Sequence, residues 1–127
     1  MTIRIAMVDD NMRNHELYTH YLGIFRKVEV VGHAYNGEEA IALCRLMAVD
    51  AILMDIEMPI MDGVEATKVI HKEFPNIAII GLTGFDDNDR IDALISAGAY
   101  GYVTKSDNIK KLLDMIHKST GKTDLID

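Results

Sequence analysis

The hydrophobic positions of this chain fall into five short apolar runs separated by longer stretches of mixed polarity. Runs of this length that are rich in Val and Ile and bounded by turn residues indicate β-strands. The first, third and fourth are almost wholly apolar, which is typical of strands buried on both faces of a sheet. The runs are IRIAMV (3–8), VEVVGHA (28–34), AILM (51–54), IAIIGL (77–82) and YGYVT (100–104).

The segments between and after these runs carry apolar residues at helical spacing. Asn36 followed by Glu39 predicts a capping box at the start of one helix, and Gly98 is expected to end another. Strand and helix alternate five times, which predicts a doubly wound α/β domain. The predicted helix faces are Leu17/Tyr21/Ile24, Ala40/Leu43/Cys44/Met47, Ala66/Ile70/Phe74, Ile91/Leu94/Ile95/Gly98 and Ile109/Leu112/Leu113/Ile116.

Chain length and composition are those of one globular unit. The 127 residues fit a single domain with one hydrophobic core. We expect residues 1–120 to form it and residues 121–127, which carry no pattern, to be a tail or the start of a linker. The sequence has no long apolar span and turns acidic too early for a signal peptide, which predicts a cytoplasmic protein without membrane contact. Cys44 is the only cysteine, so a disulfide within the chain is excluded.

Charge narrows the choice of partners. The net charge is −7, and the 13 basic residues do not gather into a stripe. Nucleic-acid binding by this chain is therefore not expected, since its electrostatic footprint is missing. An acidic protein of this kind can instead concentrate a metal cation.

Polar side chains stand where four of the five predicted strands end. Asp9 and Asp10 follow the first strand, Asp55 the third, Thr83 the fourth and Lys105 the fifth. Open α/β sheets bind ligands at the carboxyl ends of their strands, so these side chains are expected to converge. Taken singly, each has a simpler interpretation. Asp10 or Asn11 could cap the first helix, and Asp55 could open a turn. Thr83 could be an ordinary strand residue, and Lys105 could be solvated.

Together these residues favour phosphoryl transfer to a carboxylate. Three adjacent carboxylates raise one another's pKa unless a cation joins them, and a Mg²⁺ or Mn²⁺ ion bound through oxygens would do so. A carboxylate that attacks phosphorus forms an acyl phosphate. Asp55 would be that nucleophile, while Thr83 and Lys105 would neutralise charge on the phosphoryl oxygens.

Four motifs in this order resemble the receiver domain of two-component response regulators, the CheY-like family. They are VDDN (8–11), LMDIEMPIMDG (53–63), LTG (82–84) and GYVTK (101–105), and the resemblance covers essentially the whole chain. It implies a flavodoxin-like fold, in which five helices flank a parallel five-stranded sheet of order 2-1-3-4-5. It also implies a phosphorylation switch with self-directed phosphotransfer and dephosphorylation rather than an enzyme.

The resemblance assigns roles to individual residues. Asp55 would be the phosphoacceptor. The metal would be held by Asp55, by Asp10 directly, by Asp9 mainly through water and by the backbone carbonyl of Glu57. Thr83 and Lys105 would stabilise the phosphoryl group, and Thr83 and Tyr102 would form the switch. Plain strand packing remains an alternative for Tyr102.

The resemblance also implies partners. A histidine kinase would donate the phosphoryl group, and phosphorylation would favour a homodimer through the fourth helix, fifth strand and fifth helix. The region from Gly101 onward is most similar to receivers joined to a helix-turn-helix domain, so DNA would be bound through an output domain that is missing here. The family usually has proline after the lysine, whereas this chain has Ser106. A cis bond there would cost about 2.5–4 kcal/mol, so a trans bond with a different approach of Lys105 is the alternative.

Three other functions compete with this interpretation. A receiver-like module that is never phosphorylated usually lacks part of the acidic set or the lysine, and all are present here. A haloacid-dehalogenase-like phosphatase needs a second aspartate two positions after the nucleophile, where this chain has Glu57. A flavodoxin-like flavin carrier needs a phosphate loop rich in Ser, Thr and Gly, and the acidic sequence DDNMR would repel the flavin phosphate.

Overall fold

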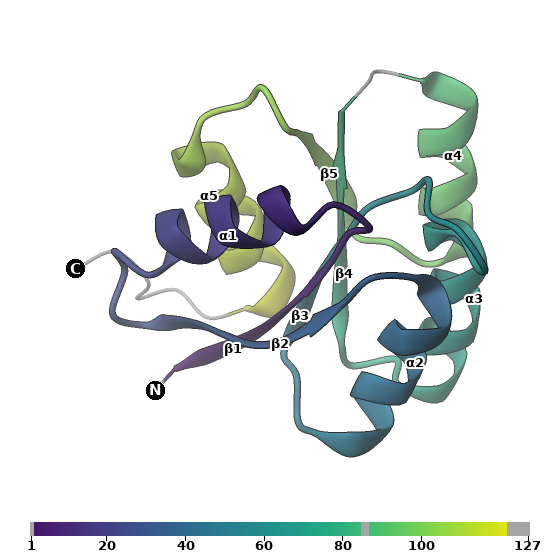
Figure 1. The fold of residues 1–127 in the computed structure, drawn as a ribbon, viewed down its shortest axis with the longest axis horizontal. Helices are drawn as coiled ribbons and strands as arrows, with labels where there is room; N and C mark the ends of the chain where they lie inside the picture. Colours follow the sequence, from purple (N-terminus) through teal and green to yellow (C-terminus); the bar gives the residue numbers. More distant parts are fainter. Residues whose placement is uncertain (1, 85–86, 122–127) are drawn as a thin grey trace.

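A computed structural model, which describes residues 2–84 and 87–121, shows five parallel strands flanked by five helices (Figure 1). The sheet order is β2-β1-β3-β4-β5, so the predicted fold class and strand order are confirmed. The strands are β1 (Ile3–Val8), β2 (Val28–Ala34), β3 (Ala51–Met54), β4 (Ala78–Thr83) and β5 (Gly101–Thr104). The helices are α1 (Met12–Leu22), α2 (Gly37–Leu46), α3 (Gly63–Glu73), α4 (Asn88–Ala97) and α5 (Ile109–Thr120).

Two hydrophobic cores lie on opposite faces of the sheet. Helices α1 and α5 cover one face and α2, α3 and α4 the other (Figure 1). Side chains alternate along each strand, so Ile52 and Met54 pack under α2–α4 while Ala51 and Leu53 pack under α1 and α5. All four side chains of β3 are fully buried, as the apolar run predicted. This double burial is what fixes the strand ends in space.

The predicted face of α1 is wrong. Leu17, Tyr21 and Ile24 are 40%, 39% and 68% exposed, and the helix ends at Leu22. The buried stripe is instead His15, Tyr18 and Leu22, which also follow helical spacing. The prediction counted apolar residues only, whereas the stripe that meets the sheet contains a histidine and a tyrosine, whose polar atoms find partners inside.

The strand limits differ slightly from those predicted. β4 runs one residue later than expected and includes Thr83, and β5 begins at Gly101 rather than at Tyr100. Thr83 pairs with Thr104, which holds the ends of these two strands level. On α4, Ile91 and Leu94 are buried as predicted, but Ile95 is 40% exposed.

The first residues of the helices agree with the sequence, and the start of α1 decides which residue caps that helix. Asn11 caps α1, because its side-chain oxygen accepts the Arg13 amide, and this leaves Asp10 without a capping role. Asn36 caps α2 by accepting the Glu39 amide, while the Glu39 carboxylate accepts from Tyr35 rather than closing the predicted box on Asn36. Gly98 ends α4 with a φ of 125°.

Two predictions concern the ends of the chain and its surroundings. The segment expected to be a tail or linker, 121–127, lies outside the described residues except for Gly121, the C-cap of α5. Within the part of the chain that the structure describes, no helix has the length and apolar character needed to cross a membrane.

Candidate functional site

The candidate site lies at the carboxyl edge of the sheet. Because β1 and β3 are neighbours, Asp9 and Asp55 leave the sheet side by side. The Asp9 amide donates to the Ala34 carbonyl at 3.1 Å, and the Asp55 amide donates to the Val8 carbonyl at 2.9 Å. These bonds continue the ladders of the sheet, so both carboxylates stand on a rigid support.

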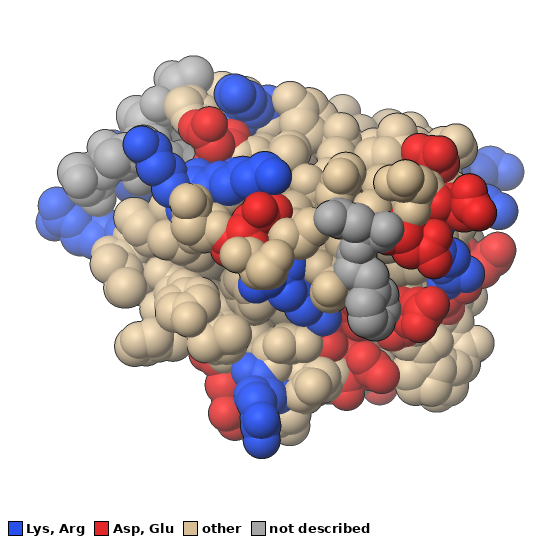
Figure 2. All heavy atoms as spheres, turned by 90° about the horizontal axis from the view of Figure 1, so that it is seen from above, with Lys and Arg blue, Asp and Glu red and all other residues tan. Residues whose placement is uncertain are grey.

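Three carboxylates meet there. Ligand oxygens of Asp9, Asp10 and Asp55 lie within 4.8 Å of one another. Asp9 is 1% exposed and Asp55 9%, whereas Asp10 is exposed. Figure 2 shows one face of the molecule, on which acidic side chains crowd one side while Lys and Arg are spread out without forming a stripe.

Lys105 supplies the positive charge closest to this cluster. Its Nζ donates to Asp9 Oδ2 at 2.8 Å and lies 3.7 Å from Asp55 Oδ1. Asp9 is further held by the Asn11 amide at 2.9 Å and by Asn14 Nδ2 at 3.1 Å. Three donors therefore hold the Asp9 carboxylate, and Lys105 Nζ lies closer to Asp9 than to Asp55.

Asp55 is short of positive charge. Burial raises its pKa from the ordinary 3.8 to about 7, and the neighbouring Asp9 and Asp10 push it the same way. Lys105 and the Ile56 amide, which donates to Asp55 Oδ1 at 3.0 Å, only partly offset this rise in pKa. A divalent cation fits such a site, because the hard oxygen donors match Mg²⁺ and the surplus charge is negative.

The loop after β3 folds tightly back on Asp55. The Gly63 amide donates to the Ile56 carbonyl at 2.7 Å, and a Cβ on Gly63 would lie 2.0 Å from the Asp55 carbonyl oxygen. Only glycine permits this approach. Asp62 caps α3 by accepting the Glu65 amide. The side chain of Glu57 is exposed and is not part of the carboxylate cluster, and a role for its backbone carbonyl stays a prediction.

The two predicted switch residues lie on adjacent strands. Thr83 is the last residue of β4 and is buried. Tyr102 of β5 is half-buried and packs against the core under α2–α4, opposite Gly81 of β4. A Cβ on Gly81 would approach both Leu94 of α4 and the Tyr102 Cβ, so β4, β5 and α4 are closely packed here.

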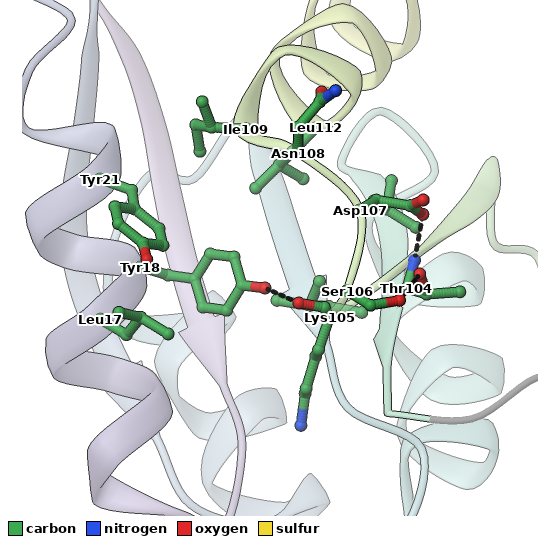
Figure 3. Close-up of a pocket in the computed structure, with 12 residues that line it drawn as sticks. Leu17, Tyr18, Tyr21, Thr104, Lys105, Ser106, Asp107, Asn108, Ile109 and Leu112 are labelled. Atoms are coloured by element: carbon green, nitrogen blue, oxygen red, sulfur yellow. Dashed lines mark hydrogen bonds between the residues drawn. The ribbon is translucent and has the colours of Figure 1, made fainter.

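The bond between Lys105 and Ser106 is trans, since no described residue has a cis peptide. A cavity of about 330 Å³ lies between α1 and the β5–α5 loop. Figure 3 shows the Lys105 side chain extending away from Tyr18, Tyr21 and Leu112, which line this cavity. The Tyr18 hydroxyl donates to the Lys105 carbonyl at 3.5 Å, and Asp107 accepts the Thr104 amide at 2.8 Å (Figure 3). Side-chain hydrogen bonds thus hold the loop where the family usually has proline, and Lys105 still reaches the carboxylates.

Sequence reasoning missed one residue next to the site. His15, 2% exposed, lies with its Nε2 2.7 Å from the Asp9 carbonyl oxygen. The apolar pattern of α1 carries no signal for it, because the buried stripe of this helix contains a histidine and a tyrosine.

Fold and site together define a doubly wound α/β protein with a cluster of three carboxylates and one lysine at its switch point. Residues 5–117 match the model of the response regulator receiver domain, so the chain belongs to that family. It is 37% identical over 120 residues to the response regulator protein VraR of Staphylococcus aureus, covering 94% of this chain and 57% of that protein. The chain therefore spans little more than half the length of that relative.

Solved structures agree. A LuxR-family two-component response regulator from Aurantimonas superimposes with a TM-score of 0.88 at 30% identity, covering 95% of this chain and 86% of that one. The response regulator domain of Thermotoga maritima CheB gives a TM-score of 0.87 at 26% identity, covering 95% and 98%. The chain is a receiver domain of two-component signalling, a family of phosphorylation switches that receive phosphate from histidine kinases and bind Mg²⁺ through acidic residues.

Proposed function

We propose that Asp55 is the phosphoacceptor of this receiver domain. The observation that carries this proposal is the position of a nearly buried carboxylate at the end of β3, where it faces two other carboxylates and one lysine. Asp10, Asp55 and the Glu57 carbonyl would hold Mg²⁺, and Asp9 would act mainly through water. The ion would supply positive charge for the phosphoryl oxygens, as metal ions do in phosphoryl transfer.

Asp55, Lys105 and Thr83 would each have a separate role in phosphoryl transfer. Oδ1 of Asp55 is engaged by the Ile56 amide and faces Lys105, so Oδ2 is the oxygen that attacks phosphorus. A P–O bond forms to Asp55 as the P–N bond to the kinase histidine breaks. Lys105 moves from Asp9 toward an incoming phosphoryl oxygen, and Thr83 donates its hydroxyl to another. Hydrolysis of the acyl phosphate restores the carboxylate, so the reaction is stoichiometric and self-directed.

Phosphorylation then shifts a two-state equilibrium. Movement of Thr83 toward the phosphoryl group leaves room behind β4, and Tyr102 turns inward beside it. The packing supports this, because Tyr102 of β5 pairs with Gly81 of β4, and β4 is the strand that ends at Thr83. The surface formed by α4, β5 and α5 would carry the change and favour a homodimer of receivers.

The remaining parts of the proposal concern the whole protein. We take residues 1–120 as the receiver and 121–127 as a tail or the start of a linker to an output domain. The LuxR-family neighbour and the share of VraR that the chain spans support a helix-turn-helix output that binds DNA, with transcription as the regulated process. A cytoplasmic location belongs to the same proposal.

The test is phosphorylation by acetyl phosphate in the presence of Mg²⁺, with the protein weighed by intact mass. The parent and Asp92→Asn, which alters an exposed carboxylate of α4, should each gain one phosphoryl group. Asp55→Asn should gain none, and EDTA added beforehand should abolish the adduct on the parent. No adduct on the parent, or an adduct that persists in Asp55→Asn, would refute the proposal.

A further inference from the structure

A pair of histidines joins the acidic turn to the neighbouring strand β2. His15 of α1 is buried, and its Nε2 lies 2.7 Å from the Asp9 carbonyl oxygen. Its Nδ1 lies 2.7 Å from Nδ1 of His33, which is exposed on β2. The His15 ring also packs against the Tyr35 ring at a centroid distance of 4.3 Å. The imidazole of His15 is therefore held on both nitrogens and on one face.

The direction of these hydrogen bonds follows from the acceptor at their end. A backbone carbonyl can only accept, so Nε2 of His15 carries the hydrogen. The short separation between the two Nδ1 atoms leaves room for one hydrogen, and a neutral His15 has none to give there. In this neutral tautomer His33 donates from Nδ1 to His15, and His15 donates from Nε2 to the Asp9 carbonyl. His33 fixes the tautomer that Asp9 needs.

The Asp9 carbonyl belongs to the peptide bond that leads to Asp10. The Asp9 amide still belongs to the sheet, since it donates to Ala34 of β2, but its carbonyl turns to a helix side chain instead. The peptide before Asp9 is therefore held by β2, whereas the plane of the peptide between Asp9 and Asp10 is held by His15 through the Asp9 carbonyl. That plane determines the direction in which the exposed Asp10 carboxylate leaves the chain, and hence its approach to Asp55.

We propose that His15, oriented by His33, is a positioning residue that holds the peptide between Asp9 and Asp10 so that the carboxylates of the site face one ion. This inference rests on the proposed function, in which these carboxylates hold Mg²⁺. It resembles the outer hydrogen bonds of other metal sites, whose loss typically lowers metal affinity about 10–100-fold.

The experiment is a titration with Mn²⁺, in which free ion is counted by electron paramagnetic resonance, and a competition with Mg²⁺. His15→Leu keeps a buried side chain but no donor, and its affinity should fall about 10-fold. His15→Gln carries an amide N–H near the place of Nε2 and should stay within about 3-fold of the parent. His33→Ala, at an exposed position, should fall between the two.

Leu22→Ala is the matched control, because it removes buried contacts from the same helix at the end away from the acidic turn. It should destabilise the domain to urea yet bind the ion as the parent does. The inference is overturned if His15→Leu binds like the parent, or if His15→Gln loses as much affinity as His15→Leu. It is also overturned if Leu22→Ala weakens binding equally at the same folded fraction. A parent that binds no ion at all would instead count against the proposed function.

Should His15→Leu fail to fold, the comparison of His33→Ala with His15→Gln still decides. Both variants keep a polar or aromatic group against Tyr35. A loss of affinity in His33→Ala together with retention in His15→Gln supports the orienting role of His33. Equal affinity of both variants and the parent refutes it.

Discussion

Replacing Asp55 by asparagine should stabilise the metal-free protein, and should do so more strongly at high pH. The carboxylate is nearly buried beside Asp9, which raises its folded-state pKa from 3.8 to about 7. At 1.36 kcal/mol per unit of pKa, this difference amounts to about 4 kcal/mol. Water still reaches part of the group, so we expect about half of it, or about 2 kcal/mol. Asparagine keeps an oxygen for the Ile56 amide and carries no charge.

The sign of the pH dependence follows from the raised pKa. When the pKa of an acid is higher in the folded state than in the unfolded state, protonation favours folding. The stability that this acid contributes is fully present at a pH below its unfolded-state pKa, and it is lost as the pH rises through its folded-state pKa. For Asp55 that window runs from about 3.8 to about 7. The advantage of Asp55→Asn over the parent should therefore grow by about 1–2 kcal/mol between pH 5 and pH 8.

Urea unfolding in EDTA, followed by far-UV circular dichroism at both pH values and constant ionic strength, measures this difference. Asp92→Asn is the control and should follow the parent, since Asp92 is exposed on α4. Saturating Mg²⁺ should reduce the difference in unfolding free energy between Asp55→Asn and the parent at pH 8, because it stabilises the parent. The reasoning is refuted if Asp55→Asn gains equally at pH 5 and pH 8, or if it is less stable than the parent at pH 8.

Two further predictions concern residues near the site and in the core. Ile60, 75% exposed, has a φ of 71°, which is costly for a β-branched residue. Ile60→Gly should therefore raise the free energy of unfolding by about 1 kcal/mol in urea, and a decrease would contradict the strain. Burial, and then Glu73, raise the pKa of Cys44 to about 11, so at pH 8 only about one thiol in a thousand is ionised. Iodoacetamide should add to the folded protein far more slowly than to the urea-unfolded one by intact mass, and equal rates would show that the thiol is accessible.

The sheet could be predicted because its evidence is local and redundant. The buried run Ala51–Met54 needs no partner to be recognised, and parallel strands with helical crossovers place their ends on one edge. Once Asp9, Asp55 and Lys105 are known to follow such strands, their proximity follows from topology. For this reason the cluster of carboxylates could be predicted from the sequence.

The buried face of α1 could not be predicted from the sequence, because two of its residues are polar and the pattern counted only apolar residues. Tyr18 and His15 enter the interior since each finds a carbonyl, that of Lys105 and that of Asp9. Those acceptors belong to residues far along the chain or in the turn before the helix, so no periodicity within α1 reveals them. Buried polar side chains depend on tertiary partners, which a count of apolar positions leaves out.

The loop after Lys105 shows how a departure from the family pattern can be compatible with the same site. A trans bond at Ser106 leaves the direction of the chain to be set by other contacts. Asp107 accepts the Thr104 amide and also faces Lys111, while the Tyr18 hydroxyl reaches the Lys105 carbonyl. These bonds fix both ends of the short turn, so the lysine side chain points back at Asp9. The position of Lys105 therefore depends on α1 as well as on β5, and α1 is also the helix that carries His15. Both the cationic and the acidic half of the site are thus oriented by side chains of one helix.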